Sequence, residues 1–452
     1  MSDRPFLQAF LFSASAILVL AATRSRRLHP FLAIMLIAPA FGLAAGFSIG
    51  PLGKAFGAGF SEAIYSPGLV IIAAGFVAAL ADGTGSSSRL AAKVDYWRGR
   101  LGSASLSALV GLIAGIAASP VTAFALLKPL LPAIGGGREE KREAVPIVLA
   151  LAISASHGVA LFSPVPIAAM AILGAKWEHV ALFGLPLALL LAAVGAAWGW
   201  WLPRPPAAVQ PPTHEGHPDL ENGTNGSAII LVLAAAIPLL MLIVQSLGDI
   251  PSEPLGGGRA RELVLGIARP LILFLVGFGI MSIGHARTSV KLLADSTWTE
   301  QVLAKVVGVV MIIGAAGGLQ QLCQETGMAE LLGERLLGWH FGIFAGLLTP
   351  FLIAALVKTL QGASLVAAIT TAGMVQPFLA PLGVAGENGK ALAALAIGIG
   401  AMAVPHVNDG FFWLVADSAR ITPLRALAVF ATGALVQGII ALAALILLSG
   451  LF

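Results

Sequence analysis

Long apolar runs are the feature that most constrains this chain. Residues 228–247, for example, read AIILVLAAAIPLLMLIVQSL. Of the 452 residues, 58% are hydrophobic and 11% are charged, whereas soluble domains carry about 25% charged residues. So few charges cannot solvate a water-exposed surface, and so much apolar surface excludes a disordered chain. The runs also lack the alternation of membrane β-strands. The sequence therefore predicts an all-α polytopic membrane protein and argues against a soluble enzyme.

A membrane-spanning helix needs about 20 apolar residues, and this length identifies the spans. The sequence contains clear spans and apolar stretches that are interrupted by polar residues, and together they give about 11–12 hydrophobic segments. The interrupted stretches contain Pro, Gly, Ser and His within apolar sequence, and they lie at 104–134, 145–173 and 337–416. The clear spans lie at 7–22, 30–48, 61–82, 179–201, 228–247, 264–282, 303–322 and 424–450.

Composition restricts the partners as well. The single cysteine, Cys323, rules out an internal disulfide and a cysteine-based metal site. No metal-ligand spacing or nucleophile–base pair is present, so we expect no cofactor, no bound metal and no enzymatic activity. The net charge of +4 does not indicate nucleic acid, because basic residues of membrane proteins usually record topology. Basic residues follow the first apolar stretch instead of preceding it, which predicts a retained first helix.

The chain divides into two similar halves. Residues 202–227 are rich in Pro, Gly and polar side chains, which is typical of a hydrophilic linker. Matching features on either side keep their order, with an offset that grows from 240 (Pro30 and Pro270) to 249 (His157 and His406). We therefore predict an N-terminal helix at 1–26, a first transmembrane repeat at 27–201, the linker, and a second repeat at 228–452. Paired halves with corresponding interruptions are typical of transporters with inverted repeats.

The distribution of basic residues predicts that these repeats are inverted. We expect 104–134 and 345–381 to be re-entrant hairpins that enter and leave on one side. The loops on one face, including 83–101 and 283–302, then hold 15 Lys and Arg residues, against seven on the other face. This asymmetry follows the positive-inside rule. An odd number of crossings separates the two repeats, so each contributes one hairpin and one broken helix in opposite orientations.

The interruptions indicate where a substrate would bind. Irregular backbone at membrane depth is tolerated only where it is buried in protein or faces a water-filled cavity. Helix N-termini at such breaks offer N–H groups to an anion, and hydroxyls can bind a polyol. The alternative is that Pro and Gly only kink packed helices. The candidate substrate-binding residues at the breaks are Ser119, Thr122, Ser156, His157, Ser163, Gly362, Ser364 and Asn408.

Ionisable residues within the apolar segments form a second group of candidates, because such residues are usually kept for function. Lys358 either binds a substrate carboxylate or extends to the interface. Asp409 is a candidate carrier of a coupling proton, with His406 as its titrating neighbour, or it caps the helix that begins at Gly410. His157 is the next candidate for the proton, or a neutral histidine bonded to a backbone carbonyl.

Four segments resemble the gluconate permease family of proton symporters, which belongs to the ion transporter superfamily. The resemblance runs from about residue 26 to the C-terminus. Its most specific part is the last of these segments together with QGASLVAAITTAG. The four segments read RLHPFLAIMLIAPAFGLAAGF, SHGVALFSPVPIAAMAILGA, LVKTLQGASLVAAITTAGMV and PHVNDGFFWLV.

The resemblance implies proton-coupled symport of a small hydroxy-carboxylate, such as gluconate or a related sugar acid, across the inner membrane. It also implies two re-entrant hairpins and often a homodimer in the bilayer. Gln361 to Ser364 match the family's hairpin tip, near its basic residue at Lys358. One departure is that no acidic residue follows Pro120, where family members usually have one. The alternative is a sodium- or proton-coupled transporter of dicarboxylates or amino acids, while a channel or a membrane enzyme fits less well.

Overall fold

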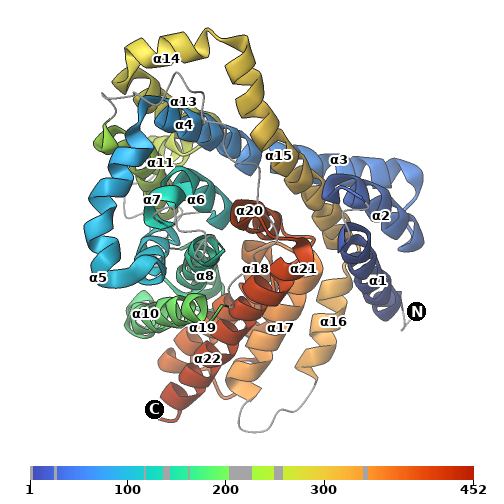
Figure 1. Ribbon diagram of the computed structural model, residues 1–452. Helices are drawn as coiled ribbons and strands as arrows, with labels where there is room; N and C mark the ends of the chain where they lie inside the picture. Colours follow the sequence, from blue (N-terminus) through green and yellow to red (C-terminus); the bar gives the residue numbers. More distant parts are fainter. Residues whose placement is uncertain are drawn as a thin grey trace.

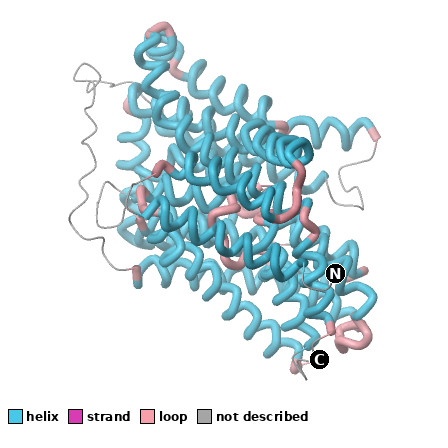
Figure 2. The backbone as a smooth tube through the Cα atoms, turned by 90° about the vertical axis from the view of Figure 1, so that its right-hand side faces the viewer, coloured by secondary structure: helices cyan, strands magenta, loops and turns pink. Residues whose placement is uncertain are grey.

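The computed structural model describes residues 4–24, 28–116, 119–135, 143–160, 163–202, 227–248, 258–338 and 345–451. Within these ranges every regular element is a helix, as Figure 2 shows by its colours. Seven of the described helices are long and apolar enough to cross a membrane, or eight if the bent pair α12–α13 forms one span. The predicted all-α membrane fold is therefore confirmed.

The first half contains α1 to α10, in the order seen in Figure 1. A π-helical turn, Ile64–Gly68, joins α3 to α4, so that Ile49–Thr84 forms one long apolar segment. A short 3-10 turn, Lys128–Leu130, joins α6 to α7. The helices are α1 (Arg4–Arg24), α2 (Pro30–Ala44), α3 (Ile49–Ala63), α4 (Leu69–Thr84), α5 (Ser86–Ala114), α6 (Pro120–Leu127), α7 (Leu131–Gly135), α8 (Ala144–Val159), α9 (Pro164–Leu173) and α10 (Trp177–Trp201).

The second half contains α11 to α22. A 3-10 turn, Gln376–Phe378, follows α18, and a π-helical turn, Leu427–Ala431, joins α21 to α22. The helices are α11 (Ala228–Gly248), α12 (Arg259–Ile267), α13 (Pro270–Gly284), α14 (Ala286–Leu293), α15 (Ser296–Glu325), α16 (Met328–Leu337), α17 (Ala345–Gln361), α18 (Ser364–Val375), α19 (Glu387–Gly400), α20 (Gly410–Ala419), α21 (Pro423–Ala426) and α22 (Thr432–Ser449).

The predicted interruptions are real breaks between helices. Residues between α5 and α6 and between α17 and α18 separate the two arms of each expected hairpin, and α8–α9 and α19–α20 are the expected broken helices. Proline starts several of these arms because its missing N–H costs nothing in the first helical turn. Pro120, Pro164 and Pro270 all stand at such a start.

Two segments that the sequence analysis treated as loops are helical. Residues 83–101 lie largely in α5, whose left-handed Gly102 (φ 78°) separates a polar first part from an apolar second part. Residues 283–302 contain α14 and the start of α15. The polar part of α5 is rich in Arg and Lys, whose straight side chains favour helix. A search for apolar spans overlooks polar helices such as these two segments.

Corresponding turns follow the long helices of the two halves. Gly85 ends α4 and Gly327 follows α15, both in the left-handed conformation, at φ 74° and φ 64°. In each turn the preceding threonine hydroxyl donates to a carbonyl of the last helical turn, Thr84 to that of Leu80 and Thr326 to that of Cys323. Thr84-Gly85 and Thr326-Gly327 are 242 residues apart, within the range of offsets that predicts the duplication, and their matching turns support that prediction.

The long segment α3–α4 packs against α15 in the opposite direction. Gly59 faces Gly317, Gly68 faces Val310 and Gly75 faces Val306, so one residue number falls as the other rises. An antiparallel pair of corresponding helices is what inverted repeats produce. The packing supports the predicted inversion, which stays a prediction. The predicted linker 202–227 lies outside the described residues, apart from its first and last residue.

Candidate functional site

A cavity of about 320 Å³ lies where three of the helix breaks meet. The residues at the start of α6, α18 and α20 line it, including Ser119, Ser364 and Asp409. The positive ends of three helix dipoles therefore border one space, an arrangement that favours an anion. Its volume is at the small end of ~300–1,000 Å³ for small-molecule sites.

Another part of the cavity wall comes from α3, the π-helical turn and α15. These elements contribute Glu62, Ser66, Gln320 and Gln321. The sequence analysis missed all four, because it searched for polar residues at helix breaks and these lie inside long apolar spans. Two signals were present: Glu62 is an acidic residue in an apolar run shortly before Pro67, and Gln320–Gln321 is an amide pair within a span. A π-helical turn in a helix often marks a functional position.

Lys358 and Asp409 form a buried ion pair on the cavity wall. Lys358 Nζ lies 2.7 Å from Asp409 Oδ2, and the two side chains are 3% and 10% exposed. The ammonium group also donates to the carbonyl of Gly362 at the hairpin tip. This placement excludes the alternative in which Lys358 extends to the membrane interface. Asp409 caps α20 as well, because its Oδ1 accepts from the N–H of Phe411 at 2.8 Å. Asp409 therefore has the capping contact that the sequence suggested, and the same carboxylate also pairs with Lys358.

His406 and Asn408 hold the broken helix against the end of α17. The last carbonyls of a helix lack partners within the helix, and these two side chains supply them. His406 Nε2 donates to the Thr359 carbonyl at 2.8 Å, and Asn408 Nδ2 donates to the same carbonyl at 3.1 Å and to that of Leu360 at 3.3 Å. Neither side chain lines the cavity. His406 instead lies beside the ring of Phe12, so it does not pair with the Asp409 carboxylate.

The first half contributes His157 and Ser154 to the cavity from α8. Ser163, at the start of α9, does not reach the cavity, since its hydroxyl lies 2.9 Å from His157 Nδ1 and donates to the His157 carbonyl at 2.6 Å. Ser156 donates to the carbonyl of Leu112 at 2.7 Å. The Thr122 hydroxyl bonds to Ser119 at 3.1 Å. These three hydroxyls position neighbouring elements of the site.

The structure therefore brings together six of the eleven predicted site residues. Thr122, Ser156, Ser163, His406 and Asn408 stand behind the wall or support it. The six that line the cavity are Ser119, His157, Lys358, Gly362, Ser364 and Asp409.

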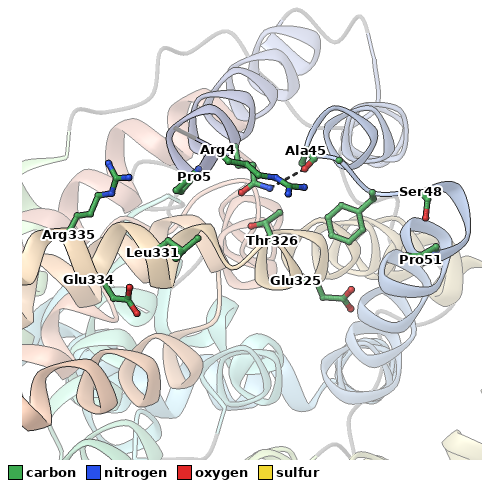
Figure 3. A pocket seen from close by; sticks show the side chains of 13 residues that line it. Arg4, Pro5, Ala45, Ser48, Pro51, Glu325, Thr326, Leu331, Glu334 and Arg335 are labelled. Carbon is green, nitrogen blue, oxygen red and sulfur yellow. Dashed lines mark hydrogen bonds between the residues drawn. The ribbon is translucent and has the colours of Figure 1, made fainter. Parts of the chain in front are cut away.

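A second hollow, of about 760 Å³, lies between α1, the turn after α2, and the end of α15 with α16. Figure 3 shows Arg4 and Arg335 around it together with Glu325 and Glu334. It is larger than the cavity at the helix breaks, but none of the predicted site residues lines it. Its mixture of both charges does not select one class of ligand.

The exposed surface is apolar over helices that face outward. Leu36, Leu182, Leu185 and Ile283 are each more than half exposed, as expected of side chains that face lipid tails. Trp200 and Trp201, at the end of α10, are exposed as well, and tryptophan is enriched at membrane interfaces. The fold and the cavity together define a multi-pass membrane protein with a polar site inside its helices, the class to which permeases belong.

The chain belongs to the GntP family of permeases, whose model matches residues 7–451. It is 28% identical over 408 residues to a gluconate permease of Pseudomonas aeruginosa, covering 88% of this chain and 87% of that protein. It is 25% identical over 406 residues to the low-affinity gluconate transporter of Escherichia coli, covering 88% and 89%. It is 24% identical over 448 residues to the D-serine transporter DsdX of Escherichia coli, covering 96% of each.

Among solved structures, the YdaH transporter of Alcanivorax borkumensis is 15% identical, with a TM-score of 0.33, and the match covers 93% of this chain and 97% of that one. The family membership confirms the resemblance drawn from the four motifs. It makes the protein a permease and not an enzyme, and a multi-pass membrane protein.

Proposed function

We propose that this permease is a secondary active transporter that takes up a small hydroxy-monocarboxylate, such as gluconate or a related sugar acid, with a proton. The observation that carries the proposal is the buried Lys358 in a cavity that three helix N-termini also face. An ammonium group and free N–H groups suit a carboxylate. Hydroxyl and amide side chains, including Ser119, Ser364 and Gln320, suit the hydroxyl groups of a sugar acid.

The cell inner membrane is the proposed location, because uptake against a gradient needs an energised membrane. Asp409 is the proposed carrier of the proton, and His157 and Lys358 are the other titratable residues from the predicted set in the cavity. The geometry favours Asp409 over His406, since the His406 imidazole is turned towards the Thr359 carbonyl. A homodimer, which the superfamily resemblance implies, remains a prediction.

The test is uptake by proteoliposomes that contain the purified protein. We expect labelled gluconate to accumulate above its outside concentration when the outside is acidic, and not when the proton gradient is collapsed. A sodium gradient imposed at equal pH on both sides is the control for the other coupling ion. Flux that only equilibrates gluconate would contradict active transport, and accumulation driven by sodium alone would contradict proton coupling.

A small amino acid is the second candidate substrate, and one observation favours it. Glu62 lines the same cavity and has no hydrogen bond or ion pair to another described residue. A zwitterion would place its carboxylate at Lys358 and its ammonium group near this carboxylate. One of the relatives is a D-serine transporter, so D-serine is the amino acid to compare with gluconate. A thermal-shift screen of sugar acids, amino acids and dicarboxylates separates the classes, and stabilisation by dicarboxylates alone would contradict both.

A further inference from the structure

The ion pair between Lys358 and Asp409 occupies the partners that a substrate would need. The Lys358 ammonium group is held by Asp409 Oδ2 and by the Gly362 carbonyl. The Asp409 carboxylate accepts from Lys358 with one oxygen and from the N–H of Phe411 with the other. A substrate carboxylate that approaches Lys358 would therefore meet an ammonium group that already has a carboxylate partner. The negative charge of Asp409 would also repel the substrate.

Charge balance decides which forms of this site are stable. An unpaired charge buried away from water costs several kcal/mol, whereas a hydrogen-bonded pair costs far less. Lys358 with ionised Asp409 is neutral as a pair. Lys358 with a substrate carboxylate is neutral as well, provided that Asp409 has become a neutral acid. Substrate without the proton leaves one excess negative charge, and the proton without substrate leaves the ammonium group of Lys358 unpaired.

We propose that the substrate carboxylate replaces Asp409 as the partner of Lys358, and that Asp409 takes up the coupling proton in the same step. The exchange rests on the proposed function and explains how the two events are linked. An O–H bond forms at Asp409 Oδ2 with a proton from the aqueous phase, and its ion pair with Lys358 is lost. A new ion pair forms between Lys358 and the substrate. One monoanion and one proton enter together, and the group formed by Lys358, Asp409 and the substrate has no net charge before or after.

Three other titratable groups lie near this pair, and each comes from a different element. Glu62 lines the cavity from α3, and His157 lines it from α8, where Ser163 lies against its ring. His406 lies on the break before α20 and donates to the Thr359 carbonyl. Among the described residues, Asp409 is the acid that shares an ion pair with Lys358. Protonation of the others would leave the Lys358–Asp409 pair intact.

The first test measures protons during binding to the purified wild-type protein. When gluconate is added in weak buffer at a pH where Asp409 is ionised, the protein should take up about one proton for each gluconate molecule bound. Over the same range, the Kd for gluconate should rise about tenfold for each unit of pH. This measurement needs no variant. Binding of gluconate without proton uptake would overturn the exchange and leave the proposed function standing. If the protein neither binds nor transports gluconate or D-serine, the proposed function itself is overturned.

The second test uses Asp409→Asn, which keeps the shape and the oxygen that caps α20 but carries no charge. Its Kd for gluconate should be independent of pH, because Lys358 no longer has to be released. Asp417→Asn is the matched control, since Asp417 pairs with Lys128 at 2.8 Å, partly exposed and away from the cavity. That variant should keep the tenfold dependence. Glu62→Gln should keep it as well, even where its affinity differs from that of the wild type.

Transport in vesicles shows how much net charge moves with gluconate, a quantity that would not change if Asp409 had only a structural role. Wild-type uptake of gluconate should carry no net charge, so a potassium–valinomycin potential should neither drive nor inhibit it. Asp409→Asn should still exchange labelled for unlabelled gluconate, lose accumulation driven by an acidic exterior, and be inhibited by an inside-negative potential. If Asp409→Asn does not bind gluconate, the proposal is tested by the wild-type protein alone, through the net charge that moves during its uptake. Wild-type uptake that moves net charge, or an Asn variant that still accumulates substrate with protons, would overturn the proposal.

Discussion

Gly362 is the residue at which the hairpin tip passes the broken helix. Its φ of +80° lies in the left-handed region, and an added Cβ would lie 2.6 Å from the carbonyl oxygen of Asn408. The Gly362 carbonyl is also a partner of Lys358. One residue therefore combines a backbone conformation that favours glycine, a close approach between two segments, and a contact with the ion pair.

Replacing Gly362 by Ala should disturb both the conformation and the approach. We expect a loss of roughly 1–3 kcal/mol in stability, the usual cost of a strained backbone position, and weaker binding of gluconate. Gly373→Ala is the control, because Gly373 lies in α18 with open space around it. Thermal unfolding in detergent and a gluconate titration measure the two effects. Equal stability and affinity in both variants would show that the approach at Gly362 is unimportant.

Sequence patterns predicted some roles of single residues better than others. Ionisable residues in apolar sequence are conspicuous, so Lys358, His406 and Asp409 could be selected without coordinates. Their partners could not be, because Lys358 and Asp409 are 51 residues apart in sequence and either could have faced another group. Asp409 was assigned a partner in His406, its near neighbour along the chain, whereas its carboxylate is paired with a residue from another helix.

At the scale of the elements, α8 and α19 cross with their backbones in contact. A Cβ on Gly398 would lie 1.9 Å from the carbonyl oxygen of Gly158, and a Cβ on Gly158 would lie 2.8 Å from that of Gly398. Small residues at such crossings allow helices in membranes to approach closely. Because α8 and α19 lead into the two breaks, this crossing fixes the distance between the halves of the site.

Gly398→Ala should push α8 and α19 apart. We expect a loss of roughly 1–3 kcal/mol, the usual cost of overpacking, together with a marked fall in transport rate. Gly308→Ala in α15 is the control, since no atom lies within 4 Å of a Cβ there. The comparison uses thermal unfolding and initial uptake rates at equal amounts of reconstituted protein. Normal uptake by the Gly398 variant would mean that the spacing of the two helices does not control the site.

The elements themselves were predicted well where apolar runs are long or broken by Pro and Gly. The helix breaks and most of the spans appeared in the sequence because membrane burial demands both length and apolar composition. The predicted span 264–282 is instead divided by a bend of 57° between α12 and α13, and within 30–48 the helix ends at Ala44. The polar helix at the start of α5 and α14 were missed, since they lie outside the apolar runs. Glu62 and Gln320 stand out in apolar sequence, but their meeting in one cavity depends on how α3 and α15 pack, which no local pattern encodes.

At the scale of the whole molecule, His285 connects parts of both halves. Its Nδ1 lies 3.3 Å from the carbonyl of Met281, and its Nε2 lies 3.1 Å from the N–H of Ser227 and 3.2 Å from the hydroxyl of Ser86. A carbonyl only accepts and an amide only donates, so Nδ1 carries the proton and Nε2 accepts. The neutral ring thus joins the end of the linker, α5 and α13.

His285→Ala should loosen this connection without touching the cavity. We expect a loss of about 1–3 kcal/mol, because partners in a buried setting lose their hydrogen bonds, while affinity for gluconate stays the same. Ser86→Ala, which removes only one of the three partners, should cost less. Thermal unfolding and a gluconate titration provide the comparison. A His285 variant that is as stable as the wild type would show that the connection contributes little.

The antiparallel packing of α3–α4 on α15 has a consequence for the origin of the chain. Gly68 packs against Val310, and the counterpart of Gly68 in the other half is Gly308, two residues away. In the predicted duplication, a helix touches its own repeat at this point. In an ancestor of half the length, two identical subunits inserted in opposite directions would have met here across a two-fold axis. A single mutation would have altered both sides of that interface at once, and gene fusion would have freed the two sides to diverge, although Gly68 and Gly308 are both still glycine and Val70 and Val310 are both still valine.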